Sequence, residues 1–125
     1  MNTSSKVFFI ITTLYFLMDL KSLGISNTEF EILRLLFRKR HRFVSLREIE
    51  SELFLRQPVV SLLTKKMREA GWVDQKEVRR KDRGRPQVMI KWNGKAKDDL
   101  LNLVRSKISE MKELEEYIAE TFTPR

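Results

Sequence analysis

Seven consecutive residues in the second half of the chain, 79–85 (RRKDRGR), combine five cationic side chains with one acid. The cations are Arg79, Arg80, Lys81, Arg83 and Arg85, and the acid is Asp82. Guanidinium and ammonium groups gathered this densely can neutralise a row of phosphates and release the counterions condensed on them. Gly84, Arg85 and Pro86 also form a slim, extended, cationic tripeptide of the kind that fits a narrow minor groove. The residues therefore indicate binding to a polyanion.

Residues 56–67 add a second polar and cationic surface, because their pattern is that of an amphipathic helix. At about 100° per residue, one face carries Val60, Leu63, Thr64 and Met67 and should pack against the preceding helices. The opposite face carries Pro58, Ser61, Leu62 and Lys65, with Lys66 at its flank. Such a face presents its first residues to base edges and its lysines to phosphates. Leu62 either contacts a thymine methyl group or belongs to a wider core face.

The excess of positive charge is confined to the middle of the chain. Residues 34–91 hold 17 Lys and Arg against 7 Asp and Glu, whereas the remaining residues hold 8 against 10. A surface charged only for solubility would be mixed in sign along the whole chain. The predicted partner is therefore double-stranded DNA. The predicted contacts are Arg56, Gln57, Pro58, Ser61, Leu62, Lys65, Lys66, Arg79, Arg80, Lys81, Arg83, Gly84 and Arg85.

The sequence lacks the residues that a disulfide, a metal site or a catalytic centre would need. The chain has no cysteine and one histidine, so it offers no disulfide, thiolate zinc site or cysteine nucleophile. His41 stands alone in a basic run and is interpreted as an exposed loop residue. The paired acids of residues 98–99 and 115–116 are neighbours on a helix, where adjacent side chains point about 100° apart. We expect no metal, no cofactor and no enzymatic activity.

Two serine caps and a proline place the elements in front of these cations. Ser26 with Glu29, and Ser45 with Glu48, predict the starts of helices over residues 28–40 and 45–53. Residues 43–44 are expected to form a short first strand and residues 54–57 a turn. Pro58 suits the first position of the next helix because it lacks an N–H.

Gly71 should end that helix in the left-handed conformation, and residues 72–73 should then return to the core. Alternation in residues 73–77 and 88–92 predicts two strands joined by a tip at residues 82–84.

Residues 93–122 form a long predicted helix that begins with Asn93 as its N-cap. Its charges are nearly balanced, and its apolar residues recur every three or four positions over about 30 Å. These residues are Leu101, Val104, Ile108, Met111, Leu114, Ile118 and Phe122. The helix either folds back on the first helix as core or forms a dimer interface, and we favour the dimer.

Residues 7–18 (VFFIITTLYFLM) are almost wholly apolar. A run of 12 residues is short of the roughly 20 that cross a bilayer, and no cleavage site typical of a signal peptide follows it. We therefore expect a cytoplasmic protein without a membrane segment. The segment is either a helix that packs against the core or the dimer, or an extension absent from the working protein with translation starting at Met18, which we favour.

The order of helix, helix, exposed helix, basic hairpin and long terminal helix resembles winged-helix transcription regulators of the MarR and TrmB-like groups, particularly small archaeal ones. Within residues 60–73, VS followed by KKM and AGWV is similar to their recognition-helix pattern, and residues 83–86 (RGRP) are similar to their wing tip. The resemblance covers residues 26–92 well, and residues 1–17 lie outside it. It implies a homodimer on a palindromic promoter site. Leu62 stands where a polar or basic residue is common in these groups.

The expected fold class is mainly α with a small β-wing, a winged helix-turn-helix domain plus a long C-terminal helix. Residues 1–17 form the apolar extension, 18–92 the DNA-binding domain and 93–125 the dimerisation helix. The expected function is sequence-specific transcription regulation, with no identifiable small-molecule effector site, because no sugar-binding extension of the larger TrmB proteins could fit. The alternatives are a non-specific, chromatin-like DNA-binding protein and a winged-helix module for protein contacts.

Overall fold

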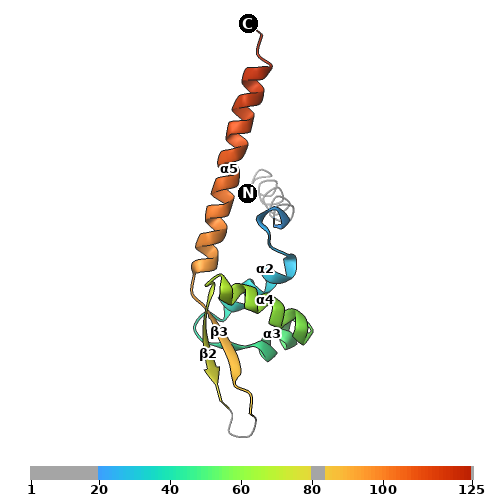
Figure 1. The fold of residues 1–125 in the computed structure, drawn as a ribbon, viewed down its shortest axis with the longest axis vertical. Coiled ribbons are helices and arrows are strands. Elements are labelled where there is room, and N and C mark those ends of the chain that lie inside the picture. Colours follow the sequence, from blue (N-terminus) through green and yellow to red (C-terminus); the bar gives the residue numbers. More distant parts are fainter. Residues whose placement is uncertain (1–19, 80–83, 125) are drawn as a thin grey trace, which may run out of the picture.

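The computed structural model describes residues 20–79 and 84–124, and it confirms the expected winged-helix architecture (Figure 1). The apolar segment 1–17 and the cations Arg80, Lys81 and Arg83 lie outside the described residues. The elements are η1 (Lys21–Leu23), α2 (Asn27–Arg38), β1 (Val44–Ser45), α3 (Leu46–Leu53), α4 (Gln57–Glu69), β2 (Val73–Val78), β3 (Gln87–Trp92) and α5 (Lys95–Thr121).

Both predicted serine caps are present. The Ser26 hydroxyl accepts from the Glu29 N–H at 3.1 Å at the start of α2, and the Ser45 hydroxyl accepts from the Glu48 N–H at 3.2 Å at the start of α3. Each cap satisfies an N–H that has no partner within its helix, which is worth about 1 kcal/mol. These two bonds fix where α2 and α3, the two helices before α4, begin.

The C-terminus of α4 is closed by Gly71, which adopts a φ of 74°. The Gly71 N–H donates to the Arg68 carbonyl at 3.0 Å, and the Trp72 N–H donates to the Met67 carbonyl at 2.9 Å. This pair of bonds is the Schellman arrangement, and the left-handed conformation that it needs is favourable for glycine. The predicted cap is confirmed, and it turns the chain directly into β2.

The three strands form an antiparallel sheet in the order β1-β3-β2. Val73 pairs with Trp92, and Val44 pairs with Ile90, so Val44, Val73 and Ile90, one from each strand, share the face toward the helices and are buried. The first strand lies one residue later than expected. The predicted hairpin of β2 and β3 is confirmed up to its tip.

The core lies between α2, α3, α4 and this face of the sheet. Each fully buried aliphatic side chain in it contributes roughly 1.5 to 3 kcal/mol by leaving water. Phe37 and Trp92 close its rim with an edge-to-face contact at a centroid distance of 5.4 Å. The fully buried apolar side chains are Ile32, Leu35, Leu36, Val44, Ile49, Val60 and Ile90.

The long helix begins later than the sequence suggested. α5 starts at Lys95 with Gly94 as its N-cap, so the assignment of Asn93 to that position is wrong. Asn93 still contributes to the start, since its side-chain carbonyl accepts from the Lys95 N–H at 3.0 Å. Gly94 has a φ of 88°, a conformation that favours glycine over asparagine at this corner.

The first turns of α5 are hydrogen-bonded to the winged part of the molecule. The Trp72 indole N–H donates to Asp99 at 2.8 Å, and the Lys95 ammonium donates to the Ala70 carbonyl at 2.7 Å. Beyond Leu100 every described residue of α5 is exposed, and the helix projects away from the sheet (Figure 1). The alternative in which this helix folds back on the first helix as core is therefore wrong.

Candidate nucleic-acid interface

The two faces of α4 are divided as its sequence predicts. Val60, Thr64 and Met67 are buried, and the Thr64 hydroxyl donates to the Val60 carbonyl at 2.7 Å. Pro58, Ser61, Leu62 and Lys65 are exposed on the other side, as is Lys66 at the flank. Leu62 is 62% exposed, which rules out its membership of the core and leaves an outward role.

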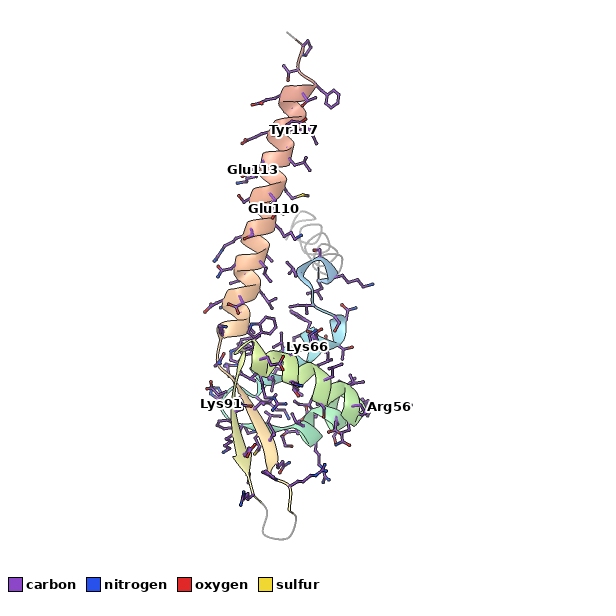
Figure 2. All side chains as sticks on the ribbon, in the orientation of Figure 1. Arg56, Lys66, Lys91, Glu110, Glu113 and Tyr117 are labelled. Carbon is purple, nitrogen blue, oxygen red and sulfur yellow. The ribbon has the colours of Figure 1, made fainter. Side chains whose placement is uncertain are left out.

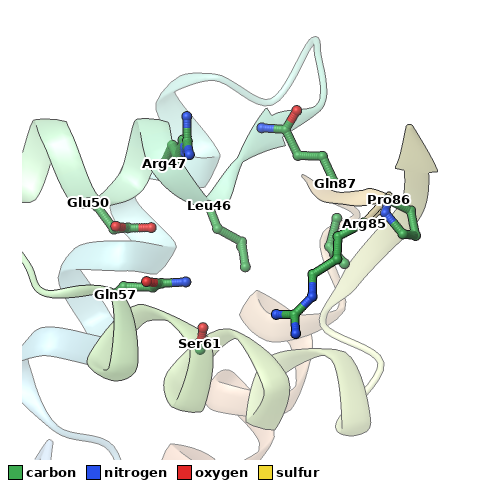
Figure 3. Close-up of a pocket in the computed structure, with 9 residues that line it drawn as sticks. Leu46, Arg47, Glu50, Gln57, Ser61, Arg85, Pro86 and Gln87 are labelled. Atoms are coloured by element: carbon green, nitrogen blue, oxygen red, sulfur yellow. The ribbon is translucent and has the colours of Figure 1, made fainter. Parts of the chain in front are cut away.

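A groove of about 460 Å³ separates the N-terminal turns of α3 and α4 from the start of β3, on the tip side of the wing (Figure 3). Gln57 and Ser61 of α4 line one side of it. The Arg85 side chain extends from the wing toward α4, so the recognition helix and the wing border one concave surface. The complete lining is Leu46, Arg47, Glu50, Gln57, Ser61, Arg85, Pro86, Gln87 and Val88.

Two residues of α3 on this groove, Arg47 and Glu50, were not predicted as site residues. They are three positions apart, so they share the helix face that points away from buried Ile49. Both residues could have been predicted from the sequence, because a residue on the outer face of α3 lies beside the start of α4. Glu50 is an acceptor within an otherwise cationic surface, and carboxylates accept from the cytosine amino group in the major groove.

Arg56, Lys65 and Arg85 form no ion pair with a carboxylate in the part of the chain that the structure describes. Arg56 is the N-cap of α4 and lies at the end of the helix remote from Lys66 (Figure 2). All three side chains are exposed, so their charges remain available to an anionic partner. Arg79 is likewise exposed at the end of β2. Gly84 is exposed at the point where the described chain resumes.

Lys66 has a structural role that the sequence did not indicate. Its ammonium lies 3.3 Å from a carboxylate oxygen of Glu29, and the Glu29 side chain is almost fully buried beneath it. The pair joins the last turn of α4 to the first turn of α2. Because this lysine already compensates a buried charge, its ammonium is less available to phosphate than that of Lys65.

Cations between α2 and α3 are also paired within the chain. The Arg42 guanidinium donates to one Glu48 oxygen at 2.9 Å and contacts the other. Lys39 contacts Glu48 and Glu52. Hydrogen bonding from Arg42, followed by that from Lys39, lowers the pKa of Glu48 from 4.5 to about 2. These cations hold two helices together, so the count of positive residues overstates the charge free to bind an anion.

The predicted seam of α5 lies on one side of the projecting helix and is not covered by described residues. Ile108 is 51% exposed and Met111 is 63% exposed. Tyr117 lies near the far end, past Glu110 and Glu113 (Figure 2). The other predicted seam residues are between 38% and 81% exposed: Leu101, Val104, Leu114, Ile118 and Phe122.

No cluster of three or more acidic or histidine side chains that could hold a metal ion occurs within residues 20–79 and 84–124. His41 is exposed in the loop after α2, as its sequence context predicts. In the same ranges no helix combines the length and the apolar content needed to cross a bilayer.

Solved structures with a similar fold are transcription regulators. A possible transcriptional regulator from Methanosarcina mazei has a TM-score of 0.64 at 16% identity, covering 78% of this chain and 83% of its own. A Staphylococcus aureus MepR mutant bound to an oligodeoxyribonucleotide gives 0.55 at 19%, covering 98% and 86%. NadR in complex with 4-hydroxyphenylacetate gives 0.54 at 16%, covering 98% and 80%.

No family model matches the sequence, and no curated protein matches it. The structural likeness therefore rests on arrangement, since fewer than one residue in five is identical. It confirms the fold expected from the resemblance to the MarR group. The chain has the winged-helix fold of these transcription regulators, with a long terminal helix attached.

Proposed function

We propose that this protein is a sequence-specific DNA-binding transcription regulator that places α4 in the major groove and its basic wing against the minor groove or phosphates. The observation that carries the proposal is the shared groove, in which the outward side of α4 faces Arg85 of the wing. Exposed cations without a described acidic partner lie at the start of α4, on its outer face and on the wing. This is the arrangement of a recognition helix flanked by phosphate contacts.

The structural neighbours support this proposal, because they are described as transcription regulators and one of them was solved on an oligodeoxyribonucleotide. The wing sequence supports it as well, since residues 79–85 hold five cations. A winged helix specialised for protein contacts would not need so dense a cationic hairpin. The cations of the wing and of Lys65 would each add to the salt dependence of binding.

We further propose that the working form is a homodimer joined through residues 93–125, with residues 18–92 as the DNA-binding part. α5 exposes a stripe about 30 Å long that includes Val104, Ile108 and Met111. Two copies of this stripe can cover each other, as the apolar seams of paired helices do. A dimer would also place two recognition helices on half-sites about one DNA turn apart.

Selection of bound duplexes from a random DNA pool, followed by affinity measurements in a salt series, tests the function. We expect one preferred site bound roughly 10³-fold or more tightly than random duplex. Changing Ser61→Ala together with Lys65→Ala should weaken that preference without changing the unfolding midpoint. The matched control is Arg105→Ala with Ser106→Ala, which removes the same kinds of group from the exposed side of α5 away from the seam.

Two outcomes would replace the proposal. Equal affinity for all duplexes, with a steep salt dependence, would identify a non-specific chromatin-like protein. A Ser61 and Lys65 double variant that binds every site as the parent does would remove α4 from the interface.

A further inference from the structure

Leu62 lies at the point of α4 that is most remote from the protein core. It is two positions from Val60 and two from Thr64, both of which are fully buried. At about 100° per residue, Leu62 is therefore about 200° around the helix from each of them. Its polar neighbours on the same outward side, Ser61 and Lys65, are exposed as well.

The surroundings of Leu62 limit which partner could bury its side chain. A protein surface that buried Leu62 would also have to desolvate the Lys65 ammonium beside it, at a cost that needs an acidic partner. The DNA major groove offers both environments within a few ångströms. The 5-methyl group of thymine is apolar and projects into the groove, while phosphates line the rims where a lysine would lie.

We propose that Leu62 recognises thymine through its 5-methyl group and thereby selects a T·A pair in each half of the bound site. This inference rests on the proposed DNA-binding function and assigns a base to one of its residues. The contact forms no hydrogen bond, so it distinguishes thymine from cytosine by the presence of a methyl group and the burial of apolar surface. Leu62 then determines specificity by apolar contact, whereas a polar side chain at this position would do so by hydrogen bonding to a base edge.

The test starts from the duplex selected from the random pool. Each thymine is replaced in turn by deoxyuridine, which removes the methyl group and leaves the base-pairing edge unchanged, and affinity is measured by fluorescence anisotropy. We expect roughly a fourfold loss at one thymine per half-site, the effect of one buried methyl-sized group, and no change at the other thymines.

Variants assign the effect to this side chain. Leu62→Ala should weaken binding to the thymine duplex by a similar factor and make binding insensitive to deoxyuridine at the responsive position. Leu62→Met, which retains apolar contact, should keep the sensitivity. Val59→Ala is the matched control, because Val59 is an exposed apolar residue on the flank of the same helix. Alanine is favourable in a helix, so the unfolding midpoint of Leu62→Ala should equal that of the parent.

Each contrary result has a separate meaning. Tight binding to a selected site that is indifferent to deoxyuridine everywhere would overturn this inference and leave the proposed function intact. Equal binding to all sequences would overturn both. If Leu62→Ala instead lowered the mass measured by sedimentation, with the deoxyuridine series unchanged, a second copy of the chain would cover Leu62. Loss of deoxyuridine sensitivity in Val59→Ala would also reject the assignment to Leu62.

Discussion

α4 and α5 are both amphipathic helices, but among residues 20–79 and 84–124 the apolar face is buried in α4 and exposed in α5. In α4, Met67 is 1% exposed and belongs to the buried core, whereas in α5, Met111 is 63% exposed. The same residue type at the same helical spacing thus contributes to folding in one helix and remains in solvent in the other. An apolar helix face that is buried within the chain stabilises the fold, whereas one that stays exposed to solvent needs a partner to cover it.

The largest effect is expected from placing charged side chains on the exposed apolar face of α5. Ile108→Glu with Met111→Lys should abolish the proposed dimer, because each pairing of two seams would bury four charges. Loss of the second half-site contact should reduce operator affinity by about 100-fold or more. Sedimentation and anisotropy measure the two effects, and circular dichroism should show a folded winged part. A parent protein that is monomeric at micromolar concentration while still binding one undivided site tightly would contradict this expectation.

Truncating the two methionines compares the faces directly. Met67→Ala should lower the free energy of unfolding by roughly 2 to 5 kcal/mol, since it leaves a cavity in the core. Met111→Ala should leave the unfolding of the monomer nearly unchanged and weaken self-association instead. Chemical denaturation at low and high protein concentration separates these effects. Equal destabilisation of the monomer by both variants would mean that the chain itself covers α5.

The cations of the wing sequence should act on affinity and not on stability. Arg83→Ala with Arg85→Ala should weaken binding to all duplexes and reduce the slope of log affinity against log salt by about one for each lost phosphate contact. The control is Arg105→Ala on α5, which should leave the slope unchanged. If the wing variant matched the parent in slope and affinity, the wing would not belong to the interface.

The smallest predicted effect concerns the ion pairs that hold α2 to α3 without help from α5. The pKa of Glu48 is lowered to about 2, so its stabilising contribution is present above pH 4.5 and is lost as the pH falls toward 2. Glu48→Gln should remove about 1 kcal/mol at neutral pH, because the carboxylate is partly solvated. Thermal unfolding in a pH series measures this.

A second variant separates the pair from a general effect of acid. Arg42→Gln should remove most of the same pH dependence, and the double variant should add little to either single change. Parallel curves for the parent and Glu48→Gln between pH 2 and 4.5 would show that this cluster does not contribute.

The elements that local chemistry determines could be predicted from the sequence. Ser26, Ser45 and Gly71 define helix ends through bonds to residues three positions away, and the spacing of Val60, Thr64 and Met67 assigns the buried face of α4. The sequence left two alternatives for Leu62, because periodicity alone allowed either an outward contact or a wider core face.

Features that depend on side chains from distant segments could not be predicted in this way. The Lys66 pair with Glu29 joins residues 37 positions apart, and the groove is lined by both Arg47 of α3 and Arg85 of the wing. The N-cap assignment of Asn93 was wrong for a similar reason, because its side-chain amide donates to Gly71 and Asp74, which lie 22 and 19 positions earlier in the chain.

Four side-chain hydrogen bonds fasten the base of α5. The Asn93 amide donates to the Gly71 carbonyl at 3.1 Å and to Asp74 at 3.2 Å, and Lys95 and Trp72 add the two bonds that join the first turns of α5 to the end of α4. These bonds oppose bending between the two helices at this corner. A tilt imposed near the far end of α5, some 40 Å away, would therefore be passed to α4 as a change of pitch.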